Sequence, residues 1–170
     1  MKIEPLRKEH IRDGFECGKP SLDTFLKQQA RQHDERRIGK TFVAVEEDSL
    51  EVIGYYTLAT GKVAFENLPD TRKLPPNLPV PVILLGRLAV DRRQKGRRIG
   101  EQLLLHALWR AQQVGKQAGV YAVEVDALDE EARGFYLRYG FVPLQDDLLH
   151  LYLTMKTIEA LNLHFEDFEG

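Results

Sequence analysis

Cationic side chains gather around one glycine-bearing turn near the middle of the chain. The turn, residues 92–100, reads RRQKGRRIG and holds four arginines and one lysine. Guanidinium and ammonium groups bind phosphate oxygens, and backbone amides at such a turn can do the same. These residue types therefore indicate binding of a phosphorylated ligand, although a basic turn can also be a plain solvated loop.

The segments on either side predict how the turn is positioned. Residues 82–90 are a dense apolar run that stops at Asp91, which is typical of a strand buried on both faces. After the turn, apolar residues recur at helical spacing: Ile99, Leu103, Leu104, Ala107, Leu108, Ala111 and Val114. A strand, a turn and a helix in this order present unpaired amides and a positive helix end to an anion. The motifs GxxxxGK[ST] and GxGxxG are absent, which excludes two common phosphate-binding loops.

Size and composition describe an ordinary globular protein. The chain has 170 residues, 43% hydrophobic and 29% charged, with a formal net charge of −2. This length predicts a single domain over residues 1–170, and the charge gives no global attraction to nucleic acid or membrane. Cys17 is the only cysteine, which excludes an internal disulfide and favours a reducing compartment. No segment is apolar enough for a signal peptide or a membrane span, so we expect a cytoplasmic protein.

The segments before the central strand predict a strand, a helix and a β-hairpin. The expected strands span residues 2–6, 41–46 and 52–60, and the last two are rich in β-branched and aromatic residues. The helix would be entered at Pro20 and end near Gly39. Its apolar face would contain Leu22, Phe25, Leu26 and Ala30.

Residues 61–81 contain five of the eight prolines in the chain. Proline lacks a backbone donor, so we expect neither continuous helix nor a central strand here. Long irregular connections tend to be functional or mobile. Two interpretations stay open for this segment: the rim of a substrate cleft, or a surface loop.

The rest of the chain completes an alternating order. Residues 120–126 predict a strand, and a short helix follows with Asp129 as its N-cap and Gly140 as its C-cap. Final strands are expected at residues 141–144 and 148–155. The resulting order, β-α-β-β-β-α-β-α-β-β, predicts an α/β protein with one mixed sheet and helices on both faces.

This order and two local motifs resemble the GNAT superfamily of acyl-CoA-dependent N-acetyltransferases, whose single sheet is mixed and mostly antiparallel. In the family, LAVD, here Leu88–Asp91, precedes a loop reading Gln/Arg-x-x-Gly-x-Gly/Ala that holds the CoA pyrophosphate. Gly100 matches the last glycine, whereas Lys95 and Arg98 replace Gln/Arg and the first glycine. At a helix start we expect Arg98 to need no positive φ, so that CoA binding survives. The resemblance implies acetyl-CoA contacts from Leu88, Ala89, Val90, Lys95, Gly96, Arg97, Arg98, Ile99, Gly100, Glu101 and Asp129.

The second motif is Asp129 followed by FYLRYGF at residues 135–141. Family members use an Asn or Asp seven residues before a tyrosine, with Gly-Phe after it, to place this helix beside the cofactor thiol. Tyr136 matches the tyrosine proposed to protonate the leaving CoA thiolate. A phenol with a pKa of about 10 can donate to a thiolate with a pKa of about 8.5. The resemblance thus implies Tyr136 as the catalytic acid, and we expect the other aromatic residues to be core: Phe135, Tyr139 and Phe141.

Four longer segments, 15–30, 41–45, 52–63 and 84–91, are similar to one branch of the superfamily. This branch contains toxins of bacterial toxin–antitoxin pairs, which acetylate the α-amino group of aminoacyl-tRNA and block translation. The resemblance implies three partners besides acetyl-CoA: aminoacyl-tRNA, a small antitoxin protein and a second copy of the chain. A basic surface could then meet RNA phosphates or serve CoA alone: Arg87, Arg92, Arg93, Lys95, Arg97 and Arg98.

Two other functions stay open. One is acetylation of a small-molecule or protein amine, and the other is CoA binding without turnover, suggested by Arg98 in the loop. The general base is unassigned. Alternation places Glu124 and Asp126 on one face of their strand, and the sequence does not show whether that face points to the site or to solvent. We expect His106 and His150 to be ordinary core or surface histidines. No Cys/His cluster has metal-ligand spacing, so no metal is expected.

Overall fold

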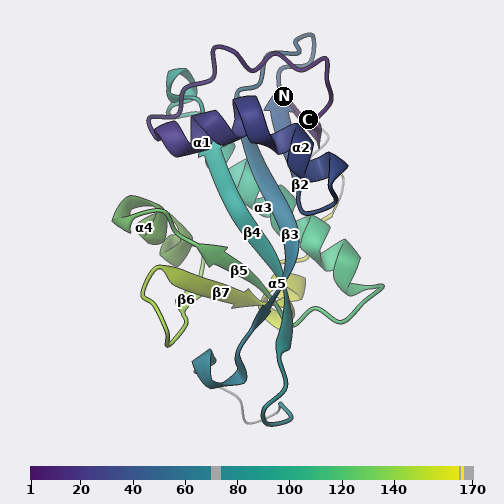
Figure 1. Cartoon of the computed structure of the whole chain (residues 1–170), viewed down its shortest axis with the longest axis vertical. Helices are drawn as coiled ribbons and strands as arrows, with labels where there is room; N and C mark the ends of the chain where they lie inside the picture. The colour runs from purple at the N-terminus through teal and green to yellow at the C-terminus, as the bar shows by residue number, and fades with distance from the viewer. Residues whose placement is uncertain (70–73, 165, 167–170) are drawn as a thin grey trace. The chain divides into compact units, whose positions relative to one another are not determined.

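Seven strands form one mixed sheet, in the order β1-β2-β3-β4-β5-β7-β6 (Figure 1). The computed structural model describes residues 1–69, 74–164 and 166. The strands are β1 (Lys2–Pro5), β2 (Lys40–Val45), β3 (Gly54–Val63), β4 (Val80–Val90), β5 (Ala122–Asp126), β6 (Val142–Pro143) and β7 (His150–Thr154). β4 and β5 pair in parallel, whereas β1–β2, β2–β3, β5–β7 and β6–β7 are antiparallel. The mixed, mostly antiparallel sheet predicted above is therefore confirmed.

Every predicted helix is present, and one more follows β7. The helices are α1 (Pro20–Thr24), a π-helical turn (Phe25–Gln29), α2 (Ala30–Glu35), α3 (Ile99–Gly115), α4 (Glu130–Arg138) and α5 (Met155–Ala160). Short 3-10 turns span Phe65–Asn67 and Arg92–Gln94. The first helical segment ends at Glu35 rather than near Gly39, because Arg37 takes a positive φ of 60°. None of the described helices is long and apolar enough to cross a membrane.

The chain folds into two compact units. The first comprises Met1–Ala59, Gly86–Trp109 and the described tail from Leu163, and the second comprises Thr60–Leu85 and Arg110–Asn162. β3, β4 and α3 each contribute residues to both units. The predicted pyrophosphate loop belongs to the first unit, and the predicted catalytic tyrosine belongs to the second.

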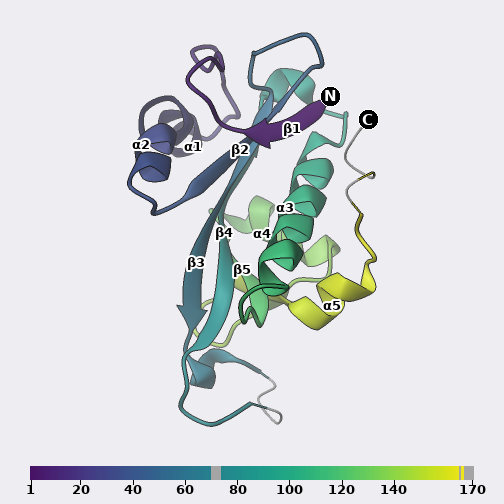
Figure 2. The ribbon, with the colours of Figure 1, turned by 90° about the vertical axis from the view of Figure 1, so that its right-hand side faces the viewer.

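In the first unit, helices cover both faces of the sheet. Figure 2 shows α1 and α2 on one face of β2 and the beginning of α3 on the other. Phe25, Leu26 and Ala30 bury the apolar face predicted for the first helical segment. They pack against the strands through Val43, Val45, Tyr55 and Ala89. This packing fixes the helical segment beside the carboxyl end of β4.

The second unit has its own apolar cluster, formed where the proline-rich segment returns to the sheet. Its members are Val63, Leu68, Val80, Val82, Ala122, Leu144 and Tyr152. The prediction that residues 61–81 are irregular throughout is wrong at both ends, since β3 runs to Val63 and β4 starts at Val80. Pro81 is tolerated in β4 because it lies at the start of the strand, where its carbonyl accepts the amide of Tyr121 at 2.8 Å. Residues 70–73 lie outside the described part.

Two burial predictions need correction. The sequence predicts that β4 is buried on both faces, but residues 86–90 are half-buried apart from Ala89. The apolar face of α3 is buried as predicted from Ile99 to Ala111, whereas Val114 in the last turn is 42% exposed. The final strands are also shorter than expected, because Met155 already begins α5.

Candidate active site

The basic turn after β4 has a defined backbone conformation. Asp91 caps the 3-10 turn Arg92–Gln94 by accepting the amide of Arg93 at 2.9 Å. The chain then reverses through Gly96, whose φ is 88°, and α3 begins at Ile99. Positive φ is the region that glycine enters without steric cost. The strand–turn–helix arrangement predicted from the sequence is therefore confirmed.

Arg98 also lies at positive φ, which corrects one expectation. An arginine at a helix start predicts an ordinary helical conformation, but its φ is 56°. A side chain in the left-handed region costs on the order of 1 kcal/mol. The side chain is 83% exposed, and its nearest ionic partner is Glu101 at 3.9 Å. Arginine here thus adopts a backbone conformation that glycine, the family's residue at this position, enters more easily.

Several amides of the turn are free to meet an anion. The amides of Lys95 and Arg97 donate to backbone carbonyls at 3.4 Å, whereas those of Gly96 and Arg98 donate to no described residue. The amides of residues 99–101 lie in the first turn of α3. The N–H groups in the first turn of a helix have no acceptor within the helix. Because this end of the helix carries partial positive charge, the turn can bind a phosphate group.

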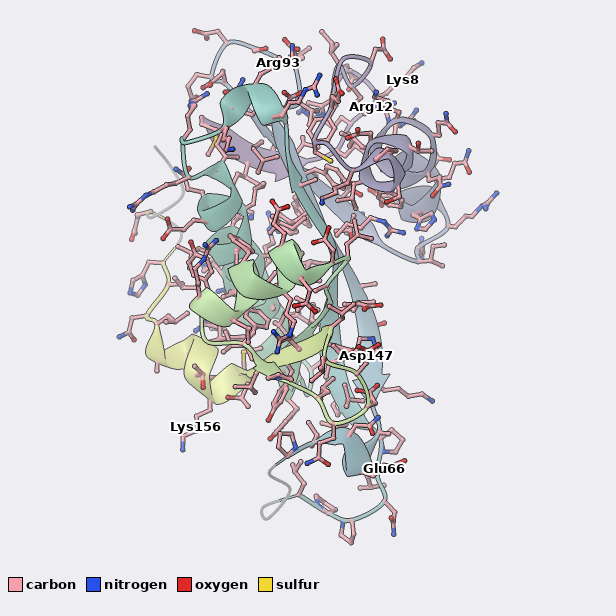
Figure 3. All side chains as sticks on the ribbon, turned by 90° about the vertical axis from the view of Figure 1, so that its left-hand side faces the viewer. Lys8, Arg12, Glu66, Arg93, Asp147 and Lys156 are labelled. Carbon is pink, nitrogen blue, oxygen red and sulfur yellow. The ribbon has the colours of Figure 1, made fainter. Side chains whose placement is uncertain are left out.

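Asp91 holds the turn to the N-terminal loop. Its carboxylate is buried and accepts four hydrogen bonds, from the Arg93 amide, Nε and Nη2 and from the amide of Glu16. The Arg92 amide in turn donates to the Glu16 carbonyl at 2.9 Å. The hydrogen bonds from Arg93 hold the pKa of Asp91 at about 2, below its ordinary value. Figure 3 labels Arg93 and Arg12, which come from these two loops.

Three of the six residues of the predicted basic surface pair with carboxylates from distant segments. Arg92 pairs with Glu16 at 2.9 Å, Arg93 with Glu51 at 3.2 Å and Arg97 with Glu46 at 2.6 Å. Both side chains of each pair are exposed, so these are surface ion pairs. The sequence could not reveal this, because the carboxylates come from distant segments (Arg97 to Glu46, for example, spans 51 positions). Lys95 has no ion-pair partner among the described residues.

In the second unit, α4 is positioned by the caps that the sequence predicts. Asp129 accepts the amide of Ala132 at 2.9 Å, and Gly140 follows the helix with a φ of 91°. Tyr136 is buried and packs against Phe135 and Phe141, with ring centroids 5.3 Å and 5.4 Å away. Phe141 is core as predicted, whereas Phe135 and Tyr139 are only half-buried.

The Tyr136 phenol is set up to remain protonated. Its burial raises its pKa above the ordinary value for tyrosine. No described residue makes a hydrogen bond to its hydroxyl group, so the proton is available for another acceptor. A buried neutral phenol can act as a general acid. The catalytic role of Tyr136 stays a prediction.

Three histidine and carboxylate predictions can be compared with the structure. His106 is buried, with Nδ1 2.7 Å from the Tyr56 hydroxyl, and is a core residue as expected. His150 lies 2.9 Å from Asp146 and 3.5 Å from Asp126, which raises its pKa. Glu124 is half-buried, and this burial raises its pKa. Within the described residues, no cluster of His, Cys, Asp or Glu could hold a metal ion.

Sequence reasoning missed a π-helical turn and Arg12 beside it, whereas Arg87 was predicted as part of the basic surface. In this turn the Ala30 amide donates to the carbonyl of Phe25, five residues earlier, instead of to that of Leu26. The released Leu26 carbonyl accepts Nη1 of Arg12 at 3.1 Å. The guanidinium of Arg87, on β4, lies over the Phe25 ring at 3.6 Å from its centroid. The apolar spacing of this helix carries no signal for the π-turn, since it equally fits a regular α-helix.

Comparison with known proteins finds relatives that match nearly the whole chain. A tRNA-acetylating toxin of Mycobacterium tuberculosis is 42% identical over 148 residues, 86% of this chain and 87% of that protein. A probable toxin TacT of Sinorhizobium fredii is 31% identical over 169 residues, 94% of this chain and 93% of that protein.

Two solved structures have the same fold. AtaT complexed with acetyl-methionyl-tRNAfMet superposes with a TM-score of 0.87 at 29% identity, covering 95% of this chain and 98% of that one. A Tyr-to-Phe variant of the AtaT toxin, bound to the C-terminus of the antitoxin AtaR and acetyl-CoA, superposes with a TM-score of 0.79 at 28% identity. That match covers 94% of this chain and 96% of the other. The model of the acetyltransferase (GNAT) domain matches residues 37–143, and the chain therefore belongs to the GNAT acetyltransferase family.

Proposed function

We propose that this protein is an acetyl-CoA-dependent N-acetyltransferase that acetylates the α-amino group of an aminoacyl-tRNA and thereby blocks translation. The observation that carries this proposal is the 42% identity to a tRNA-acetylating toxin over most of both chains. A second observation supports the proposal: AtaT, which has the same fold, has been solved in complex with acetyl-methionyl-tRNAfMet, an acetylated aminoacyl-tRNA. Acetylation neutralises the amine that would otherwise attack in peptide-bond formation.

The first unit would bind the CoA moiety. Free amides between Gly96 and Glu101 fit a pyrophosphate, which they would hold together with the positive end of α3. The backbone of Leu88 and Val90 would pair with the pantetheine arm like an added strand. The ladder between β4 and β5 covers Val82–Leu85, so residues 86–90 extend beyond it. Lys95 and Arg98 would contribute charge to the phosphates.

Tyr136 would supply the proton that completes the reaction. A neutral amine nitrogen attacks the thioester carbon, and the amide of Leu88 or Val90 would stabilise the oxyanion that forms. The nitrogen then gives a proton to water and the carbon–sulfur bond breaks. Tyr136 donates its proton to the departing sulfur and regains one from solvent. An aminoacyl ester amine has a lower pKa than lysine, so this substrate needs no dedicated base. Asp129 would keep α4, and with it Tyr136, in place.

Further partners follow from the same relatives. We propose a small antitoxin as the neutralising partner, because AtaT is bound to the C-terminus of the antitoxin AtaR. The family match includes residues of both units, which supports a single catalytic domain over residues 1–170. A homodimer stays a prediction. Since aminoacyl-tRNA is made in the cytoplasm, we propose this compartment for the protein.

Cell-free translation with purified protein and labelled acetyl-CoA tests this function. We expect translation to stop and the label to appear on aminoacyl-tRNA after RNA is separated from protein. Base hydrolysis of the ester should release an N-acetylated amino acid, which mass spectrometry identifies. The Tyr136→Phe variant is the matched control and should leave translation running at equal protein concentration.

Other distributions of the label would change the conclusion. Label on a protein or a small amine, with translation unaffected, would overturn the tRNA acceptor but keep the acetyltransferase. Binding of acetyl-CoA without transfer to any component would overturn the enzymatic proposal. An arrest that persists without acetyl-CoA would show that RNA binding alone, rather than acetyl transfer, stops translation.

A further inference from the structure

The π-helical turn at Phe25–Gln29 holds two arginines from distant parts of the first unit. It releases the Leu26 carbonyl, which binds Nη1 of Arg12, and it presents the Phe25 ring, which lies under the guanidinium of Arg87. π-turns within helices occur often at functional sites. Here the turn gives both side chains a fixed orientation, because a carbonyl and an aromatic face hold them.

These two cations lack the compensation that the loop arginines have. Arg12 and Arg87 are both half-buried, and neither is within ion-pair distance of a carboxylate in the described part of the chain. Burial lowers the pKa of each guanidinium, and Arg31 lowers that of Arg12 further, against the opposing effect of Asp13. Half-buried positive charge without a counter-charge is unfavourable in the free protein. An anionic ligand would offset this cost.

Position along the strand relates the pair to the reaction. Arg87 immediately precedes Leu88, whose backbone is assigned above to the pantetheine arm. In the proposed complex, a cation at this point would lie nearer the thioester end of the cofactor than its pyrophosphate. The basic turn, by contrast, follows the strand at residues 92–100, and three of its arginines pair with Glu16, Glu51 and Glu46. Arg12 and Arg87 are therefore better placed than the turn for an anion on the acceptor.

We propose that Arg12 and Arg87 bind phosphates at the single-stranded 3′ end of the acceptor RNA and so select a polynucleotide over a free amine. This inference rests on the proposed function and assigns its substrate specificity. Arginine suits the task because its planar guanidinium binds phosphate through two hydrogen bonds. The Phe25 ring also holds the Arg87 guanidinium, with Cζ 3.6 Å from the ring centroid, which fixes the group before RNA binds.

Steady-state kinetics with three substrates test the proposal. The acceptors are an aminoacyl-tRNA and a 3′-aminoacyl-adenosine without phosphates, each at saturating acetyl-CoA, and acetyl-CoA itself is then varied. The variants are Arg12→Gln and Arg87→Gln, with Arg36→Gln as the control. Arg36 is exposed at the C-terminal end of α2 in the same unit, so its replacement makes an equal charge change away from the π-turn.

Each test variant should lower kcat/KM for aminoacyl-tRNA at least tenfold, mainly through KM. The values for aminoacyl-adenosine and acetyl-CoA should stay within twofold of the wild type. The slope of log kcat/KM against log salt should fall by about 0.7 for each phosphate group that the variant no longer binds. Arg87→Lys should keep this slope but not the full affinity, because an ammonium group keeps the charge without the planar stack. Phe25→Leu should weaken RNA selection in the same direction.

The outcomes separate this inference from the proposed function. A wild-type enzyme that acetylates the adenosine ester but not aminoacyl-tRNA would overturn both. A wild-type enzyme active on aminoacyl-tRNA, with test variants that behave like Arg36→Gln, would overturn only the phosphate-binding role of the two arginines. Equal losses on aminoacyl-tRNA and aminoacyl-adenosine would also overturn this role, because a disturbed fold or thioester site would affect both acceptors. Thermal unfolding of each variant shows whether the fold is intact.

Discussion

The Arg93 side chain binds both oxygens of the Asp91 carboxylate, with Nε and Nη2 each 2.9 Å from a different oxygen atom. Asp91 is buried, while Arg93 reaches outward and also binds Glu51 and the carbonyl of Gly14. This pair joins the end of β4 to the N-terminal loop. The conformation of the predicted pyrophosphate turn therefore depends on one buried carboxylate and its charge.

Stability should consequently depend on pH through Asp91. Its folded-state pKa of about 2 lies below the ordinary 3.8, so its contribution is present above pH 3.8 and is lost as the pH falls toward 2. Asp91→Asn should reduce the free energy of unfolding at pH 7 by about 2 kcal/mol, because charged hydrogen bonds are lost. Urea unfolding at several pH values measures this. The difference between wild type and variant should shrink below pH 4, and a constant difference would contradict the assignment.

Tyr136→Phe should reduce kcat by roughly 10²–10⁴ without weakening acetyl-CoA binding, because it removes a proton donor and little else. No described residue bonds to the hydroxyl, so the melting temperature should change little. Steady-state kinetics measures kcat, and isothermal titration calorimetry measures the affinity for acetyl-CoA. Unchanged turnover would remove Tyr136 from the mechanism, and weakened acetyl-CoA binding would make it a binding residue instead.

Arg98→Gly should stabilise the protein by about 0.5–1 kcal/mol, since glycine enters the left-handed region without the strain that arginine bears there. Arg36→Gly makes the same chemical change at a residue with a φ of −83°. There the greater freedom of glycine in the unfolded chain should destabilise the protein by a similar amount. Chemical denaturation of both variants checks the expected opposite signs, and equal signs would refute the strain at Arg98.

Two glycine-to-alanine changes should also have opposite effects. A Cβ at Gly54 would lie 2.9 Å from Cδ1 of Leu103 and 3.2 Å from the carbonyl oxygen of Ala89. Gly54→Ala should therefore cost about 1–3 kcal/mol through overpacking. At Gly134, inside α4, a Cβ meets no atom within 4 Å, and alanine should add about 0.5–1 kcal/mol of helix stability. Thermal denaturation measures both. If Gly54→Ala left the stability unchanged, Leu103 and β4 would be able to shift away from the added methyl group.

The features best predicted from the sequence are those that depend on residues close together in the chain, such as helix caps and apolar helix faces. Asp129 and Gly140 cap α4 as expected, because capping depends on side chains and conformations within one helical turn. The apolar face of α3 is likewise visible in its spacing. Pro81 shows the opposite case. A proline in general argues against a central strand. Pro81 lies at the start of β4, however, and its carbonyl accepts a hydrogen bond from the amide of Tyr121.

The parts of the candidate site that depend on distant residues could not be predicted. The arginines of the turn appear in the sequence as a basic patch, yet Glu46 and Glu51 neutralise two of them from the segment between β2 and β3. The positive φ of Arg98 is equally hidden, because arginine at a helix start gives no sign of it. Nothing in the sequence around Arg12 indicates that its guanidinium binds the carbonyl of Leu26, 14 positions later.

The π-helical turn also affects how this helix can change during evolution. Such a turn holds one residue more than a regular helix, so a single deletion there restores α-helical pairing and leaves the flanking turns in place. Deleting the exposed Gln28 would keep Phe25 and Leu26 on the same face as Ala30. The hydrogen bond from the Ala30 amide to the Phe25 carbonyl would then span four residues, as in a regular α-helix. Deletion of one codon would thus convert the π-helical turn into a regular α-helical turn.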